Sequence, residues 1–239
     1  MRKDHRPYFL KRALSKFQRF YTEHFLRPHF EFLGKNPAIL NPWYVEVFGS
    51  PIDIGDYVSI VAASDNRVRL SVWSDKQIRG QIRIGNYCLL CPGVRISSAS
   101  KIHIGENCML ASGVYVTDSD WHDIYNRLAI GKTESVEIAD NVWIGDSAIV
   151  CKGLSIGENS IIGAGAVVVH SIPANCIAAG NPAQIVKHLD PAESFITRKQ
   201  MFSKTSNLFA EIDQLDRQLL QENTLLRWLR YVFFPAKGD

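Results

Sequence analysis

The chain has 239 residues, a formal net charge of +3, and 46% hydrophobic against 21% charged residues. This balance is typical of a globular protein and excludes a largely disordered chain. No apolar run approaches the roughly 18–20 residues of a membrane-spanning helix, and the charged N-terminus does not resemble a secretory signal. We therefore expect a protein that is cytoplasmic, either free or peripheral at the inner face of the membrane, and whose five cysteines are free thiols.

Residues 1–27 predict an amphipathic, basic helix. Residues 1–36 carry nine Lys or Arg against three Asp or Glu, whereas residues 50–190 carry eleven against fourteen. The helix either packs its apolar face on the body of the protein or lies on an anionic membrane surface, where it could grip a lipid-linked acceptor. The acidic body argues against a nucleic-acid partner. The apolar positions recur at intervals of three or four: Leu10, Leu14, Phe17, Tyr21 and Phe25.

After an extended lead-in at residues 36–50, aliphatic residues recur at every sixth position. In the first run only Asn66 is not aliphatic, and its turn-forming neighbours predict a loop there. After Ile96 the run resumes at Ile104, two residues later than the period requires. A second run, from Ile138 to Val168, has no miss. The positions are Ile54, Ile60, Val72, Ile78, Ile84, Leu90, Ile96, Ile104, Leu110, Val116, Ile138, Ile144, Val150, Ile156, Ile162 and Val168.

A period of six fits neither an α-helix nor a flat strand. It fits coils of short parallel strands, joined by tight turns, that stack and bury a continuous column of aliphatic side chains. We therefore expect a mainly β domain over residues 46–189. A helical extension and lead-in, residues 1–45, precede it, and a helical segment, residues 190–239, follows it. The cysteines fall at repeat positions and are expected to pack there.

Residues 117–135 interrupt the repeat, and a loop extruded from a solenoid commonly carries binding or catalytic residues. This loop contains His122, preceded by Asp118 and Asp120. Histidine is a suitable base for removing a hydroxyl proton, provided that a partner orients its ring. Asp118, Asp120 or a backbone carbonyl could be that partner.

Apolar residues in the C-terminal segment follow a four-three spacing, which is typical of a coiled seam. The seam could join subunits, or the helix could fold back on the β domain. Residues 227–234 are basic and aromatic and could contact a membrane surface, although packing explains them as well. The spaced positions are Leu208, Ile212, Leu215, Leu219, Leu226, Leu229 and Phe233.

The repeat resembles that of the hexapeptide-repeat acyltransferases. Asn141-Val142-Trp143-Ile144-Gly145 and Ala179-Gly180-Asn181-Pro182-Ala183 are similar to signature segments of the galactoside, maltose and polysaccharide O-acetyltransferase subgroup. The resemblance implies a left-handed parallel β-helix and a homotrimer with active sites between neighbouring subunits. It also implies an extruded loop with a catalytic histidine, a position that His122 matches.

The resemblance further implies transfer of an acyl group, most simply acetyl from acetyl-CoA, to a hydroxyl of a sugar or glycan, without a metal. Trp143, Gly145, Ala164 and Lys187 match positions that line the donor groove. No nucleophile elbow or Cys–His signature is visible, which favours direct transfer over a covalent acyl-enzyme.

The sequence departs from the subgroup at three places. Val169-His170 replaces a frequent Thr-Lys, and Gln184 replaces a frequent cation, which leaves an acyl-carrier-protein donor open. Leu90-Cys91-Pro92-Gly93 lacks the asparagine of the galactoside and maltose enzymes. The alternatives are N-acyl transfer to an amino sugar and a non-catalytic scaffold. A carbonic anhydrase on this fold would need three zinc-binding histidines, and only His122 lies in the loop.

Overall fold

The computed structural model describes residues 4–74, 79–190, 192–203 and 208–236. The chain forms two compact units. One comprises Met1–Phe20 with Gln200–Asp239, and the other comprises Tyr21–Lys199.

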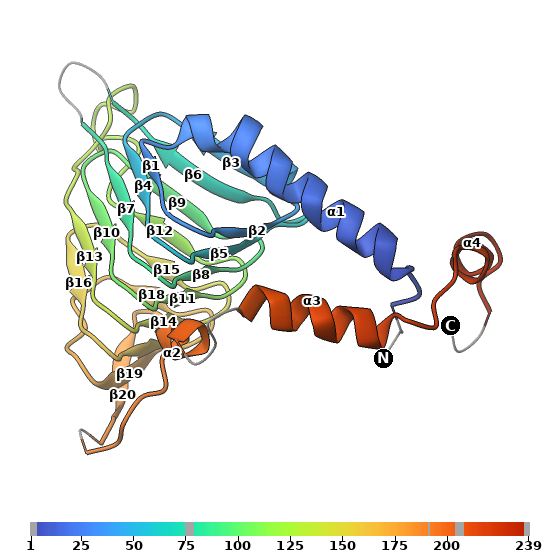
Figure 1. Ribbon diagram of the computed structural model, residues 1–239. Coiled ribbons are helices and arrows are strands. Elements are labelled where there is room, and N and C mark those ends of the chain that lie inside the picture. Colours follow the sequence, from blue (N-terminus) through green and yellow to red (C-terminus); the bar gives the residue numbers. More distant parts are fainter. Residues whose placement is uncertain (1–3, 75–78, 191, 204–207, 237–239) are drawn as a thin grey trace. The chain divides into compact units, whose positions relative to one another are not determined.

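The Tyr21–Lys199 unit is a solenoid of short strands that the chain lays down in three sheets, visited in the order A, B, C (Figure 1). Within the described residues the strand pairs are parallel and in register, apart from antiparallel β19–β20. Sheet A contains β1 (Phe32–Leu33), β4 (Ile52–Ile54), β7 (Ile82–Ile84), β10 (Ile102–Ile104), β13 (Val136–Ile138) and β16 (Leu154–Ile156). Sheet B contains β2 (Ala38–Leu40), β5 (Ser59–Val61), β8 (Leu89–Leu90), β11 (Met109–Leu110), β14 (Trp143–Ile144), β17 (Ile161–Ile162), β19 (Cys176–Ala179) and β20 (Gln184–His188). Sheet C contains β3 (Val45–Phe48), β6 (Val68–Val72), β9 (Arg95–Ser98), β12 (Tyr115–Thr117), β15 (Ile149–Val150) and β18 (Val167–Val168).

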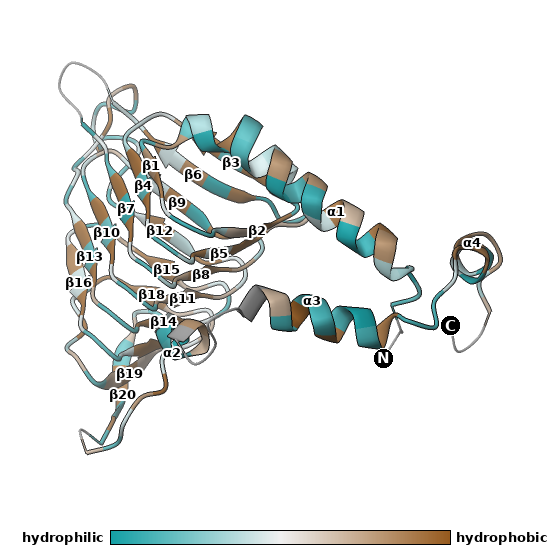
Figure 2. Cartoon of the chain, in the orientation of Figure 1, coloured by the Kyte–Doolittle hydropathy of each residue, from teal (hydrophilic) through white to brown (hydrophobic). Residues whose placement is uncertain are grey.

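The core consists of aliphatic columns inside the coils. In sheet A, register places Ile54, Ile84, Ile104, Ile138 and Ile156 directly above one another, and each is at most 1% exposed. Figure 2 shows the hydrophobic residues spread along the strands of every sheet. The aliphatic residue at every sixth position of the sequence is therefore the side chain that points into the core.

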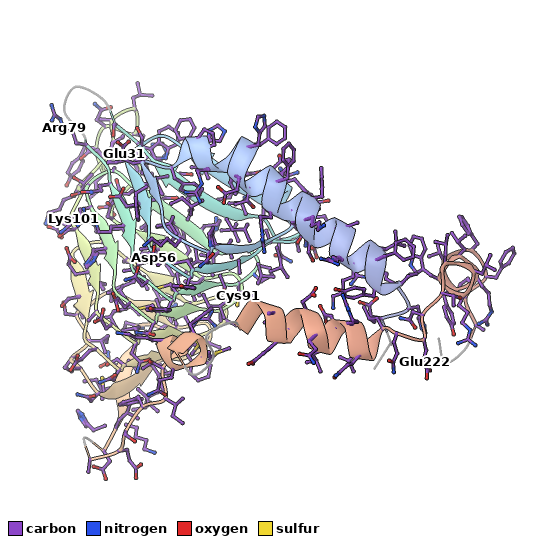
Figure 3. All side chains as sticks on the ribbon, viewed as in Figure 1. Glu31, Asp56, Arg79, Cys91, Lys101 and Glu222 are labelled. Atoms are coloured by element: carbon purple, nitrogen blue, oxygen red, sulfur yellow. The ribbon has the colours of Figure 1, made fainter. Side chains whose placement is uncertain are left out.

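In each of six turns that lead from sheet A to sheet B, one residue adopts the left-handed backbone conformation, with φ between +56° and +61°. These residues are Tyr57, Tyr87, Asn107, Asn141, Asn159 and Asn175. Asparagine tolerates this conformation better than most residues. Asn141 Nδ2 donates to Asn159 Oδ1 at 2.9 Å, and Asn159 Nδ2 donates to Asn175 Oδ1 at 3.0 Å. At the same junction Asp56, labelled in Figure 3, accepts from the Lys35 backbone N–H at 2.7 Å. These bonds stack one turn on the next.

The solenoid begins earlier than residue 46. β1 pairs with β4, β2 with β5 and β3 with β6, so the expected lead-in is itself the first coil. The loop expected at residues 64–66 is present, and Ala63 and Asn66 exchange backbone hydrogen bonds at 3.2 Å.

A second loop leaves between β6 and β7, where the sequence predicted an unbroken coil. Ser74 and Arg79 form an antiparallel bridge, and Arg79 lies outside the β-helix (Figure 3). Ile78, expected in the core, lies outside the described residues. The sequence pattern did not reveal this insertion, because Val72 and Ile84 remain twelve residues apart, which is two periods of the six-residue repeat.

The Met1–Phe20 and Gln200–Asp239 unit is helical. Its contacts join α1 (Tyr8–Tyr21) to α3 (Leu208–Leu219): Tyr8 Oη donates to Asp213 at 2.8 Å, and Lys11 pairs with Asp216 at 2.6 Å. The expected C-terminal seam is interrupted, because α3 ends at Leu219 and Thr224 caps a separate α4 (Leu225–Phe233). The remaining helical segments are η1 (Thr22–Leu26), η2 (Arg27–His29), η3 (Pro42–Tyr44) and α2 (Arg198–Ser203). None of the helices in the described residues is long and apolar enough to cross a bilayer.

Candidate active site

The expected extruded loop is a hairpin at the junction from sheet C to sheet A, between β12 and β13. Ser119 and Thr133 form an antiparallel bridge at its base. Asp120 N–H donates to the Lys132 carbonyl at 2.9 Å, and Gly131 N–H donates to the Asp120 carbonyl at 2.7 Å. The backbone therefore holds the loop as an ordered arm that projects from the coil.

Gly131 lets the two sides of the hairpin approach closely at His122. A Cβ atom at this position would lie 2.8 Å from the His122 carbonyl oxygen and 2.9 Å from the Asp120 Cβ. Such distances are too short for a side chain, so a glycine is required where the second arm passes the histidine.

The His122 ring is exposed on the first arm, and its Nδ1 lies 2.8 Å from the Arg127 carbonyl oxygen. A carbonyl oxygen can only accept, so Nδ1 carries the proton of the neutral ring and Nε2 is left as the acceptor. The sequence left three possible partners for the His122 ring, and in the structure the partner is a backbone carbonyl, that of Arg127. A base needs this tautomer to remove a proton from a hydroxyl group.

Asp118 does not orient His122. Its side chain is fully buried and bonds to the preceding coil: Oδ2 accepts from Ser98 Oγ at 2.6 Å and from Ser100 N at 2.9 Å, and Oδ1 accepts from Ala99 N at 2.7 Å. Both carboxylate oxygens are therefore occupied in anchoring the start of the hairpin.

Asp120 likewise anchors the hairpin and does not bond to the His122 imidazole in the structure. Its Oδ1 accepts from Lys152 Nζ at 2.8 Å, and Lys152 belongs to the following coil. The two carboxylates thus tie the loop to the coils on either side of it. Sequence reasoning missed Ser98, Lys152 and Arg127, because the first two are separated from the loop in sequence and Arg127 acts through its backbone.

The expected donor-groove residues lie on sheet B and at its junction with sheet C. Register places Trp143, Ile161, Ile177 and Lys187 in one row across β14, β17, β19 and β20, so Trp143 and Lys187 share a face. At neighbouring strands about 4.8 Å apart, the row spans roughly 14 Å. Trp143 and Lys187 therefore lie on one surface of sheet B.

Gly145 and Ala164 lie just after the last residues of β14 and β17. A Cβ on Gly145 would lie 2.6 Å from the Ala164 backbone nitrogen, so the two coils approach each other closely there. This surface is at a different junction of the solenoid from the His122 hairpin, which leaves between sheets C and A. One chain therefore does not bring His122 together with the groove residues.

Aromatic side chains lie next to the hairpin along the C–A junction. The Trp121 ring is 5.9 Å from Trp73, which is 5.0 Å from Phe48. Trp121 Nε1 also donates to Tyr115 Oη at 3.0 Å. Among the described residues, no group of three or more His, Cys, Asp or Glu side chains could hold a metal ion.

Comparisons with known proteins agree with this architecture. Residues 135–170 match the family model described as bacterial transferase hexapeptide (six repeats), and residues 81–118 match the hexapeptide repeat of succinyl-transferase. Galactoside O-acetyltransferase of Escherichia coli is 35% identical over 170 residues, which are 70% of this chain and 68% of that protein. The chain belongs to the hexapeptide-repeat acyltransferases.

Other members of this acyltransferase family match in part or in fold. A putative acetyltransferase of Saccharomyces cerevisiae is 45% identical over 62 residues, so the match covers 26% of this chain but only 32% of that protein. A hexapeptide-repeat-containing acetyltransferase of Vibrio cholerae has a TM-score of 0.50 at 22% identity, covering 74% of this chain and 82% of that chain. The solenoid is thus the left-handed β-helix of the family.

Proposed function

We propose that the protein is an O-acyltransferase that moves an acetyl group from acetyl-CoA to a hydroxyl of a sugar or glycan. The observation that carries the proposal is the His122 ring, held on an ordered hairpin with Nε2 as its acceptor. Family membership and the 35% identity to a galactoside O-acetyltransferase support it.

In the proposed reaction His122 Nε2 accepts the proton of the acceptor hydroxyl while that oxygen attacks the thioester carbonyl carbon. The C–O bond forms and the C–S bond breaks. The imidazolium then returns its proton to the departing thiolate, so protons balance without a covalent enzyme intermediate. General base catalysis of this kind contributes about 10²–10⁴-fold. Asp118 and Asp120 serve by keeping the hairpin in place.

We propose that Trp143, Gly145, Ala164 and Lys187 hold the donor. The row from Trp143 to Lys187 is long enough to support an extended pantetheine arm. Because this row and His122 lie at different junctions of one chain, the site becomes complete when the hairpin of one subunit meets the groove of the next. A three-fold closed homotrimer provides such a contact three times.

The proposed glycan acceptor is compatible with a location at the membrane surface. α1 presents exposed Phe9 and Leu14 together with Arg12 and Lys16, and α4 presents exposed Phe233. Basic, aromatic amphipathic helices bind anionic bilayers at their surface. Co-sedimentation with phosphatidylglycerol vesicles tests this contact, and recovery of the whole protein in the supernatant would exclude it.

The activity is tested by CoA release from acetyl-CoA with sugar acceptors. We expect turnover in the wild type and a loss of about 10²-fold or more in His122→Ala. His29→Ala, which removes an exposed histidine of η2, is the matched control and should retain activity. Absence of turnover with acetyl-CoA, but turnover with acyl-carrier thioesters, would correct the donor. Turnover with amino sugars alone would correct the reaction to N-acyl transfer.

The shared site is tested by mixing two inactive variants. His122→Ala lacks the base, and Ala164→Trp blocks the groove. Co-refolded mixed trimers should regain activity, because some sites then combine an intact hairpin with an intact groove. Activity that stays at the level of the separate variants, or a monomer in sedimentation, would contradict the intersubunit site.

A further inference from the structure

A small pocket opens where β6 and β9 begin on the outer face of sheet C. Its volume is about 290 Å³, and its lining contains three arginines, Arg67, Arg69 and Arg95, beside the turn at residues 64–66. Neither the proposed base nor the donor groove uses these side chains.

Strand register forces two of these cations together. β6 pairs with β9 so that Arg69 lies directly opposite Arg95, with both side chains exposed on the same face. Like charges in this position destabilise a sheet. An anion that lies between the two guanidinium groups would reduce this repulsion.

The neighbouring carboxylates do not neutralise the pocket fully. Glu46 Oε1 accepts from Arg67 at 2.6 Å and Oε2 accepts from Arg69 at 2.7 Å, and these bonds hold the pKa of Glu46 below its ordinary value. Both of its oxygens are thus engaged away from Arg95. Three arginines against Glu46 and Asp65 leave one positive charge at the pocket.

Contacts along sheet C connect the pocket to the proposed base. The Arg95 guanidinium lies 4.4 Å from the centre of the Tyr115 ring, and Tyr115 Oη accepts from Trp121 Nε1 at 3.0 Å. Trp121 directly precedes His122, and its ring packs against Trp73, which is 47% exposed. Charged and aromatic side chains therefore form one continuous surface from the pocket to the hairpin.

We propose that the acceptor is an anionic saccharide, whose phosphate or carboxylate binds between Arg69 and Arg95. Guanidinium groups present forked donors that match either oxyanion. The exposed Trp73 ring and the half-buried Trp121 ring, inclined at 60° to each other, provide aromatic faces for the sugar ring. This inference rests on the proposed acyl transfer, and it narrows the acceptor class to sugars that carry an acidic group.

Binding is measured first, by calorimetry with galactose, galacturonate and galactose 1-phosphate. The protein is His122→Ala, so that no turnover interferes. We expect at least one anionic sugar to bind about tenfold or more tightly than galactose. The double variant Arg69→Gln/Arg95→Gln should lose this advantage while its affinity for galactose is unchanged. Arg83→Gln, an exposed arginine on sheet A, is the matched control. The stronger of the two anionic ligands identifies the acidic group.

Kinetics then separates the acceptor from the donor. In the active enzyme, Arg95→Gln should raise the KM for the anionic acceptor and leave the KM for acetyl-CoA unchanged. A rise only in the KM for acetyl-CoA would overturn the inference, because the arginines would then serve the donor phosphates. Equal affinity for galactose and both anionic sugars would also overturn it.

Failure of the two proposals would look different. Tight binding of an anionic sugar that depends on Arg69 and Arg95, without acyl transfer by the wild type, would refute the proposed function and leave the anion site established. Acyl transfer with no preference for anionic sugars would refute the anion site alone.

Discussion

Replacing Asp118 with alanine tests how the hairpin that carries His122 is anchored. The substitution removes the acceptor of three hydrogen bonds, donated by Ser98 Oγ, Ala99 N and Ser100 N, at a fully buried position. Ser98 Oγ keeps the Gln81 carbonyl as an acceptor at 2.9 Å, so Ala99 N and Ser100 N are left without one, and each buried donor of this kind costs about 1–3 kcal/mol. Water entering the vacated space satisfies some of these donors, so we expect a loss of about 3–5 kcal/mol in the free energy of unfolding.

The loss is measured by guanidinium denaturation at a fixed protein concentration, because association also contributes to stability. Asp120→Ala is the matched control. It removes a partly exposed ion pair with Lys152 and should cost less than about 1 kcal/mol. Asp118→Asn keeps the shape and one acceptor oxygen, so its loss should be intermediate.

Activity provides a second readout of the anchor. Asp118→Ala should lower turnover at least tenfold under conditions where the variant is folded, since the hairpin no longer holds His122 in position. A loss of stability below about 1 kcal/mol, or an equal loss in Asp120→Ala, would refute the anchoring role of Asp118.

Three further substitutions probe the coil and the site. Gly145→Ala should lower stability by about 2–3 kcal/mol in thermal unfolding, because its Cβ would lie 2.6 Å from the backbone of the next coil; a loss below 1 kcal/mol would contradict this close approach. Asn159→Val should cost about 1–2 kcal/mol more than Asn159→Gly in the same assay, since φ is +60° there, and equal losses would argue against backbone strain. Trp121→Phe keeps an aromatic side chain but loses the hydrogen bond to Tyr115, so stability should fall by about 1 kcal/mol and the acceptor KM should rise. An unchanged acceptor KM would exclude Trp121 from the acceptor surface.

The core residues could be predicted because the buried positions of the coils are occupied by aliphatic residues. Positions such as Ile84, Leu90 and Ile96 must be aliphatic to fill the coil, and their spacing reports the length of each side. The first coil escaped notice since its buried residues, Ile39 and Val45, follow irregular turns. The insertion after Val72 escaped notice for the opposite reason, because it preserves the phase of the repeat.

The position of His122 could also be predicted, since the interruption of a regular repeat marks the hairpin. Its orienting partner could not, because the Arg127 carbonyl is a backbone group that any residue supplies. Asp118 was misassigned for a related reason. A carboxylate in a polar loop suggests an exposed side chain, and only the fold reveals that the preceding coil surrounds it.

The inserted segments of the solenoid all leave at junctions between sheets. The turn at residues 63–66 leaves between sheets B and C, and the segments at 73–81 and 118–135 leave between sheets C and A. The strands on either side keep their register across each of them. Closing a loop costs entropy that grows only with the logarithm of its length. Junction segments can therefore lengthen, shorten or be exchanged with little effect on the stack, so that descendants of one scaffold can acquire new acceptors without having to evolve a new core.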